Sequence, residues 1–245
     1  FSVDHKKIGL LYMTSMVIFF LFGMTLGLMI RLEMLTPGKT FITGRAYNTV
    51  FTLHGLTMIF LFVIPGLMAS FGNFLLPLHI GARDVAFPRL NLLSWWLFII
   101  GGVLIYSTIV LAVVGWAEPI DTGWTFYAPY SVKTSSSVSL AGLGVFSIGF
   151  SSILTGVNFV TTIHRMRCPG MTFSRMTLFV WTLYTTGWLQ VLATPVIGIT
   201  LVMLLMERAL GVGFFDPAKG GDPVLFQHMF WIYSHPAVYI MIIPA

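Results

Sequence analysis

The sequence predicts an all-α integral membrane protein with about six transmembrane helices, and three observations support this. Apolar residues make up 57% of the 245 residues and charged residues only 9%, whereas soluble domains carry about 25% charged residues. The mean hydropathy is +0.91. Six apolar stretches reach the length of about 20 residues that a helix needs to cross a bilayer. No soluble domain boundary interrupts them, so we expect a single transmembrane domain over residues 1–245.

The first three expected spans cover residues 8–30, 49–80 and 90–116. Arg31 closes the first span. The second is longer than a crossing requires, so we expect it to tilt or to extend beyond the hydrocarbon. Pro65 inside it is tolerable where neighbouring helices satisfy the freed carbonyls. Small residues such as Gly101 and Gly102 in the third span allow a neighbouring helix to approach closely, which favours a packed bundle.

The last three expected spans cover residues 138–163, 176–206 and 224–244. Gly142 and Gly144 again favour close packing in the fourth span. The fifth is long and contains Pro195, where a kink is tolerable if neighbouring helices satisfy the freed carbonyl. It is also rich in polar residues, which we expect to bond between helices: Thr177, Thr182, Thr185, Thr186, Gln190 and Thr194.

Charge and cysteine content exclude several classes of protein. The sequence pI is near 9.5, but the basic residues lie in short loops and form no stripe, so we expect no nucleic-acid partner. The single Cys168 cannot form an internal disulfide. Phe1 to Lys7 do not resemble a signal peptide. Because the chain starts without Met and ends directly on an apolar segment, we expect it to be incomplete.

Lys and Arg divide almost evenly between the two sides of the expected bundle. The densest basic cluster is formed by Arg165, Arg167 and Arg175, on the same side as the N-terminus. Because the two totals are nearly equal, the positive-inside rule does not decide the orientation by itself. We take the side of this cluster, and with it the N-terminus, as cytoplasmic. On the opposite side, the 117–137 loop is rich in aromatic residues. It is either an interfacial aromatic belt or a cover over a cofactor.

His54 lies well inside the second span, next to Gly55, which lets a bulky planar group approach the backbone. A neutral imidazole in a helix is a common axial ligand of heme iron, and ionisable residues within lipid usually have a function. The alternative is a buried histidine that bonds a carbonyl on the next helix. His5, His79, His164 and His228 lie at span ends or in loops, where we expect them to be solvated.

His235 and Tyr239 lie four residues apart in the sixth span, so they share one face of a helix. Imidazole binds copper and heme iron, and a phenol within reach can supply an electron and a proton. The alternative is an interhelical hydrogen bond, with Pro236 merely kinking the helix.

Asp84 lies between two arginines at the mouth of the expected bundle. It is either half of a weak surface ion pair or the collector of protons for a chain of waters. Amides and hydroxyls within the bundle that can hold such waters are Asn73, Asn91, Ser94, Ser151, Ser152 and Asn158. Arg31 either bonds a buried oxygen of a cofactor or reaches to the interface.

These features together resemble subunit I of the heme–copper oxidases, the terminal oxidases of respiratory electron transport. The resemblance covers essentially the whole chain and the first six of that subunit's usual twelve helices. The matching runs are Met29 to Gly38, Thr52 to Gly55, Phe71 to Asn73, Asp84 to Asn91, Asn158-Phe159, Trp231, and His235-Pro236 through Tyr239.

The resemblance implies roles for particular residues. His54 matches an axial ligand of the low-spin heme A, and Arg31 matches the arginine that bonds its formyl group. His235 matches a ligand of the copper called CuB, which is paired with a second, high-spin heme A, and Tyr239 matches the tyrosine linked to that histidine. Two tryptophans match residues of the heme region, Trp124 and Trp231. Asp84 matches the entrance of the D proton channel, whose polar lining corresponds to Tyr12, Asn73, Asn91, Ser94, Ser151, Ser152 and Asn158.

One departure from the family pattern concerns the proton path. Many members have Glu directly after His-Pro, whereas this chain has Ala237. Tyr233 shares a helix face with that position, and Ser234 lies beside it. The pattern is similar to the A-type subtype with a Tyr-Ser pair, common in oxidases that carry a fused cytochrome c. The reference pKa of a phenol is near 10, so we expect this pair to anchor a water chain.

The resemblance implies reduction of dioxygen to water, coupled to proton pumping across the bacterial cytoplasmic membrane. Expected partners are membrane lipid, oxidase subunits II and III, and cytochrome c or a fused cytochrome c domain as electron donor. The remaining metal ligands and the K-channel lysine would follow Ala245. Alternatives are a quinol oxidase, a nitric oxide reductase and, from another class, a heme-free membrane transporter. A purely structural bundle fits poorly with His54 and His235 inside the membrane.

Overall fold

The structure is a computed structural model that describes residues 2–38 and 41–245. The described residues form helices and turns, with one isolated bridge between Glu118 and Ser136 and no strand. The main helices are α1 (His5–Glu33), α2 (Gly44–Leu56), α3 (Gly72–Ile80), α4 (Pro88–Val113), α6 (Val138–Arg165), α7 (Leu178–Leu210) and α8 (Pro223–Ile242). Shorter elements are η1 (Thr57–Val63), η2 (Gly66–Phe71), α5 (Tyr130–Lys133), η3 (Phe173–Arg175) and η4 (Pro217–Lys219).

The prediction of an all-α membrane protein is confirmed. In the described part of the chain, five helical segments are long and apolar enough to cross a membrane: His5–Glu33, Gly44–Ile80, Pro88–Val113, Val138–Arg165 and Leu178–Leu210. The sixth expected span forms the 20-residue helix α8. α8 is not among these five segments; it has no charged residue but contains Gln227, His228 and His235.

The helix boundaries differ from the expected ones by a few residues because capping residues set them. The Asp4 side chain accepts hydrogen bonds from the backbone N–H of Lys6 and Lys7, so α1 starts before the apolar run begins. Pro88 occupies the first turn of α4. Gly211 adopts the left-handed conformation at φ 71° and ends α7 beyond the expected residue 206.

The second span is continuous but changes its helical register around Pro65. This residue has no backbone N–H, so the ordinary helical ladder is interrupted there. The π-helical segments η1 and η2 lie on either side of it. The missing donor is therefore accommodated by wider helical turns, which are frequent at functional sites. These turns determine how far His54, before them, and Asn73, after them, are rotated from each other about the helix axis.

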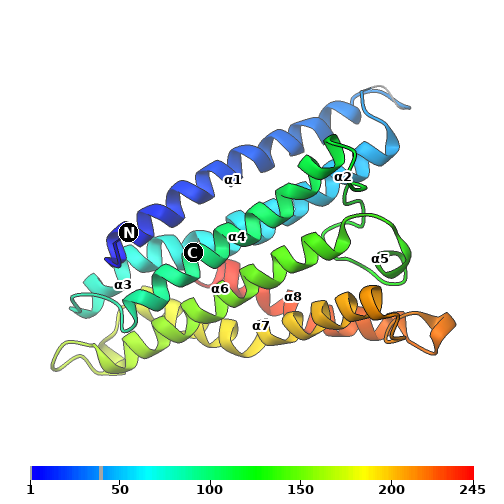
Figure 1. Cartoon of the computed structure of the whole chain (residues 1–245). Coiled ribbons are helices and arrows are strands. Elements are labelled where there is room, and N and C mark those ends of the chain that lie inside the picture. The colour runs from blue at the N-terminus through cyan, green and yellow to red at the C-terminus, as the bar shows by residue number, and fades with distance from the viewer. Residues whose placement is uncertain (1, 39–40) are drawn as a thin grey trace.

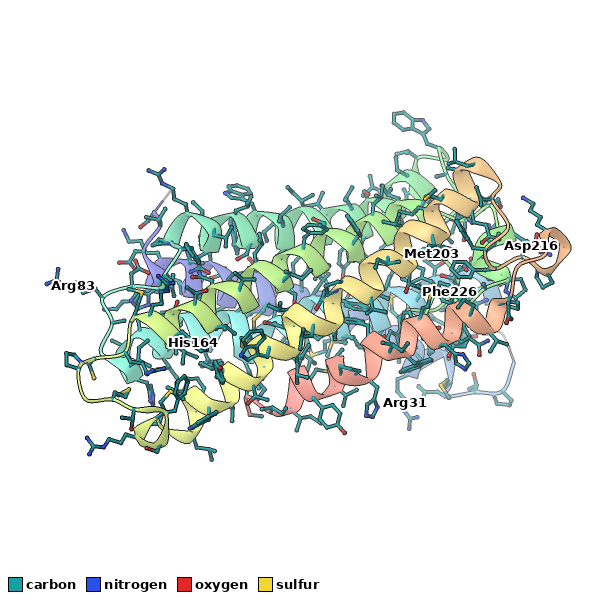
Figure 2. The ribbon with its side chains drawn as sticks, turned by 90° about the horizontal axis from the view of Figure 1, so that it is seen from below. Arg31, Arg83, His164, Met203, Asp216 and Phe226 are labelled. Atoms are coloured by element: carbon teal, nitrogen blue, oxygen red, sulfur yellow. The ribbon has the colours of Figure 1, made fainter. Side chains whose placement is uncertain are left out.

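The helices lie side by side along one common direction (Figure 1). α1 packs on the second span, and α4, α6, α7 and α8 follow one another as a row of neighbours (Figure 2). A Cβ at Gly101 would lie 2.6 Å from the carbonyl oxygen of Gly144, and one at Gly144 would lie 2.8 Å from that of Gly101. The two glycines thus allow the backbones of α4 and α6 to approach, as the sequence predicts.

The connecting loops gather at two opposite ends of the bundle. Arg83 and His164 lie at the end that also holds the N-terminus, and Asp216 lies at the other (Figures 1 and 2). At the second end, Arg208 of α7 donates hydrogen bonds to the carbonyl oxygens of Ser131, Val132, Thr134 and Ser136. A guanidinium fork that binds four carbonyls holds the α5 loop against α7.

Candidate active site

His54 projects from α2 onto the backbone of α1. Its Nδ1 donates a hydrogen bond to the carbonyl oxygen of Gly23 at 2.8 Å. A Cβ at Gly27 would lie 2.9 Å from the His54 Cε1 atom, so the absence of a side chain there makes room for the ring. The hydrogen bond fixes the tautomer with the proton on Nδ1. In the described part of the chain nothing bonds Nε2, so this nitrogen presents a lone pair.

Arg31 lies one helical turn beyond Gly27 on α1, and therefore on the face that His54 contacts. Its side chain is exposed, and no described residue bonds it or forms an ion pair with it. The guanidinium is thus available to an oxygen of a group held beside His54. The structure is compatible with either expectation for Arg31, a cofactor contact or a reach to the interface.

His235 and Tyr239 meet on one face of α8, as the spacing predicts. The His235 Nε2 lies 3.4 Å from the Tyr239 hydroxyl oxygen, and the ring centroids are 5.1 Å apart. Both side chains are exposed, with 48% of Tyr239 accessible. This face of α8 is therefore uncovered by the described residues. The imidazole and phenol are free to contact a further element.

Trp124 of the 117–137 loop connects the regions of the two histidines. A Cβ at Gly55 would lie 2.8 Å from its Cδ1 atom, so the indole packs directly on the backbone next to His54. The Trp124 ring also meets Trp231 edge to face, with centroids 6.0 Å apart. Trp231 lies one turn before His235, and its Nε1 donates a hydrogen bond to the Tyr127 hydroxyl at 2.5 Å. Trp124 therefore packs between the helices of His54 and His235.

Tyr233 and Ser234 are buried, at 3% and 4% exposure, on the inward side of α8. Together with Ala237 they line a cavity of about 230 Å³ that also reaches Phe60 and Trp124. The Ser234 hydroxyl has no hydrogen-bond partner among the described residues. The prediction that Tyr233 shares a face with position 237 is thus confirmed. Because residue 237 is Ala and not Glu, no carboxyl fills this part of the cavity.

The structure brings three of the expected polar-path residues into one buried hydroxyl cluster. The Tyr12 hydroxyl donates to Ser94 Oγ at 3.0 Å and lies 3.2 Å from Ser151 Oγ. Ser94 and Ser151 each donate onward to a backbone carbonyl. All three residues are at most 4% exposed, so α1, α4 and α6 meet in a polar centre within the apolar bundle.

Next to this cluster, the amides of Asn73 and Asn91 are in contact. Asn91 Nδ2 donates to Asn73 Oδ1 at 2.6 Å, and both residues are buried. The Asn91 Oδ1 atom has no hydrogen-bond partner among the described residues. Since Ser94 Oγ donates to the Asn91 carbonyl oxygen at 2.7 Å, the amide pair and the hydroxyl cluster are connected.

His5 was expected to be solvated, and this expectation is wrong. The side chain is 3% exposed, and its Nδ1 donates to the Asn73 carbonyl oxygen at 2.6 Å. The Asp4 cap starts α1 at this residue and turns the imidazole inward. A polar cap directly before His5 is the signal that could have placed it in the first helical turn. His79, His164 and His228 are exposed, as expected.

Asp84 and Asn158 hold the loop at the mouth of the bundle. Asp84 forms no ion pair with a described residue, and its Oδ1 accepts a hydrogen bond from the Val85 N–H at 2.7 Å. Asn158 Oδ1 accepts from the Phe87 N–H at 2.9 Å, and its Nδ2 donates to the Phe87 carbonyl. Asn158 is therefore bonded to the loop backbone, and no bond joins it to the two other amides.

The family of the chain follows from comparison with known proteins. Residues 7–245 match the family described as Cytochrome C and Quinol oxidase polypeptide I. The chain belongs to this family.

Three curated relatives are named cytochrome c oxidase subunit 1. The chain is 44% identical to that of Bacillus sp. (strain PS3) over 246 residues, 42% to that of Thermostichus vulcanus over 245, and 43% to that of Synechocystis sp. over 245. Each alignment covers 100% of this chain and 39%, 43% and 43% of the relative. The chain thus spans about two fifths of the length of the relatives it matches.

Membership in this oxidase family implies heme and copper cofactors. Histidines of the chain fit as some of the ligands of these cofactors. A histidine with Nδ1 bonded to a carbonyl and Nε2 free is the usual state of a metal-ligating imidazole. The described residues contain no group of three His, Cys, Asp or Glu that could hold a metal. His54 therefore fits as one ligand of a group that also needs ligands from elsewhere. The exposed imidazole of His235, with Nε2 beside the Tyr239 hydroxyl and Nδ1 unbonded among the described residues, offers one more nitrogen.

Proposed function

We propose that the chain forms part of the catalytic subunit of a terminal oxidase that reduces dioxygen to water. The observation that carries this proposal is His54, fixed by Gly23 with its Nε2 free, in a chain of the oxidase family. Hemes A and copper supply electron transfer and oxygen reduction when bound. The low-spin heme would be held by His54, and the copper paired with the high-spin heme would be held by His235.

The protein's own residues orient the proposed metal ligands and supply protons. The Gly23 carbonyl keeps the proton of His54 on Nδ1 and increases the basicity of the ligating nitrogen. Arg31 places a permanent positive charge and several donors on the same face. Tyr239 holds a proton on its phenol oxygen, 3.4 Å from His235 Nε2, where oxygen reduction consumes protons.

The polar residues form a path for these protons. Asp84 collects protons at the mouth of the bundle, and the Asn73–Asn91 pair leads to the Tyr12 hydroxyl cluster. Tyr233 and Ser234 then anchor waters in the cavity beside Ala237. Ser152 lines the path, and Asn158 holds the loop at its entrance. This path supports proton uptake and pumping, with the N-terminal end of the bundle on the cytoplasmic side of a bacterial cytoplasmic membrane.

The proposed partners are oxidase subunits II and III and a cytochrome c, free or fused, as electron donor. The names of the curated relatives favour cytochrome c. A quinol donor is the second candidate, because the family description includes quinol oxidases. Heme-free transport is disfavoured by the family membership and by the Nε2 that His54 presents.

The test is oxygen consumption by the complete purified oxidase, supplied in turn with reduced cytochrome c and with quinol. We expect rapid consumption with cytochrome c and the absorption bands of heme A. Oxygen consumption with quinol but not with cytochrome c would show that quinol is the electron donor. Nitric oxide reduction without oxygen consumption, or the absence of heme bands, would contradict the proposal.

A further inference from the structure

A second, smaller cavity lies next to the Tyr12 hydroxyl cluster, between α1, the second span, α4, α6 and α7. Its volume is about 20 Å³, and a buried water needs about 10–15 Å³ measured in this way. Its polar lining comes from Tyr12, Ser151, Ser152, Thr155 and Gln190. The cavity is thus large enough for about one water and offers the two to four polar partners that a buried water requires.

Gln190 is the amide of this lining and comes from the middle of α7. It is 2% exposed, and its Oε1 has no hydrogen-bond partner among the described residues. The Ser152 Oγ atom, on the facing helix α6, is also buried without a partner. Buried polar atoms are nearly always bonded to protein or to ordered water, so both oxygens point to a water between them.

Close packing of α6 and α7 holds Gln190 at the cavity. A Cβ at Gly156 would lie 2.8 Å from the Gly187 carbonyl oxygen and 3.2 Å from Gln190 Oε1. Only a glycine on α6 lets the two backbones approach to this distance. The amide is thereby fixed beside α6 without bonding to it, which contradicts the expected role of Gln190 as a bond between helices.

The unpartnered oxygens form a stripe along α7. Thr186, Gln190 and Thr194 are spaced by four residues, are at most 2% exposed, and each has a side-chain oxygen without a partner. Other threonines of α7 bond within their own helix, including Thr182 to the Phe179 carbonyl and Thr200 to the Val196 carbonyl. The unpartnered atoms are therefore a feature of this face, not of threonine in α7 generally.

The small cavity lies between the two halves of the proposed proton path. It shares Tyr12 and Ser151 with the hydroxyl cluster, and it shares Phe60 with the larger cavity of Tyr233 and Ser234. Phe60 belongs to the π-helical segment η1 and is 3% exposed. Its ring thus separates the two cavities.

We propose that Gln190 binds an ordered water through Oε1, and that this water carries protons from the Tyr12 cluster toward Tyr233 and Ser234. The water accepts a proton from the side of Ser151 while it releases one of its own to a water of the larger cavity beside Phe60, so Gln190 orients it and keeps its own protons. Gln190 is a positioning residue in this step. The inference rests on the proposed function only for the direction of proton flow; the water site itself does not.

The test uses the complete oxidase with Gln190→Met, Gln190→Glu and the control Thr200→Val. Met preserves the length of the side chain without the acceptor, so the core remains filled. Glu retains an oxygen acceptor. Thr200 is buried on the same helix but does not line the cavity. The two readouts are water density beside residue 190 in a high-resolution structure, and the rate of proton uptake when the reduced oxidase meets oxygen.

We expect water density in the unaltered oxidase, in Gln190→Glu and in Thr200→Val, and none in Gln190→Met. Loss of one hydrogen bond to the water should slow proton uptake about tenfold in Gln190→Met, with the low-spin heme spectrum unchanged. An empty cavity in the unaltered oxidase, or normal uptake in Gln190→Met, would overturn the inference. Absence of oxygen reduction in the unaltered oxidase would instead overturn the proposed function.

Discussion

The indole of Trp124 meets that of Trp231 edge to face, with ring centroids 6.0 Å apart. Through this contact the 117–137 loop joins the helix of His54 to the helix of His235, because Trp124 also packs on Gly55 and Trp231 precedes His235 by one turn. Edge-to-face aromatic pairs add about 0.5–1.5 kcal/mol beyond the burial of their surface. The two expected metal ligands are therefore held in relation to each other by residues that lie far apart in the sequence.

Gly55→Ala should disturb the packing of Trp124 on α2, and with it the position of His54 relative to His235. The new Cβ would lie 2.8 Å from Trp124 Cδ1, so the indole must shift, and overpacking of this kind costs about 1–3 kcal/mol. We expect a lower thermal stability and a shifted low-spin heme band in the absorption spectrum. Gly198→Ala is the matched control, because its Cβ would meet Phe146 at an ordinary 3.6 Å. An unchanged spectrum in Gly55→Ala would show that Trp124 does not position His54.

Tyr239→Phe should abolish oxygen reduction while leaving the low-spin heme spectrum intact. The substitution removes only the hydroxyl, which lies 3.4 Å from His235 Nε2, and Tyr239 is exposed, so the helix loses no buried bond. Oxygen consumption and the absorption spectrum of the complete oxidase check both parts. Full turnover in the variant would refute a role for the Tyr239 proton.

Tyr12→Phe should slow proton uptake with only a small loss of stability. Ser94 and Ser151 keep their own bonds to backbone carbonyls, so the substitution removes hydrogen bonds worth about 1 kcal/mol each. Tyr106→Phe is the control, because it removes a similar interhelical bond, to Thr57 at 2.8 Å, outside the polar path. Equal proton uptake in the two variants, measured with a pH-sensitive dye, would contradict the path.

Lys133→Met should change how stability depends on pH. The hydrogen bond from Lys133 Nζ, 3.0 Å from Asp216 Oδ1, and then the Ala218 N–H lower the pKa of Asp216 below its usual range. Since the folded-state pKa is lowered, the pair stabilises the fold fully at neutral pH, and its contribution disappears as the pH falls through that pKa, below about 4.

Thermal denaturation at several pH values measures this difference. The midpoint of Lys133→Met should lie below that of the unaltered protein at neutral pH and converge with it in acid. Arg83→Met removes an exposed charge that has no ion pair among the described residues and should leave the pH profile unchanged. A constant difference between Lys133→Met and the unaltered protein at all pH values would exclude the ion pair as its cause.

Hydropathy and spacing predicted the spans, the shared face of His235 and Tyr239, and the shared face of Tyr233 and Ala237. These features depend on a single helix, whose periodicity is visible along the sequence. The buried position of His5 and the bond of Asn158 to the 84–91 loop depend on caps and on contacts between distant elements. Neither has a periodic signal, and the π-helical register around Pro65 has none either.

The expected bonding role of Gln190 was wrong for a related reason. A buried amide in an apolar span usually has a function, but the sequence does not show whether it faces a helix or a cavity. The answer depends on Gly156, which brings α6 and α7 together, and on Ser152, which leaves a second oxygen unpartnered. Side chains from five helical segments had to be placed before this cavity was apparent.

The most direct test is the absorption spectrum and copper content of the complete oxidase with either histidine replaced. We predict that His54→Ala loses the low-spin heme band and keeps its copper. His235→Ala should lose the copper of the oxygen-reducing centre and keep the low-spin heme band. Retention of both the heme band and the copper in either variant would contradict the assignment of that histidine as a metal ligand.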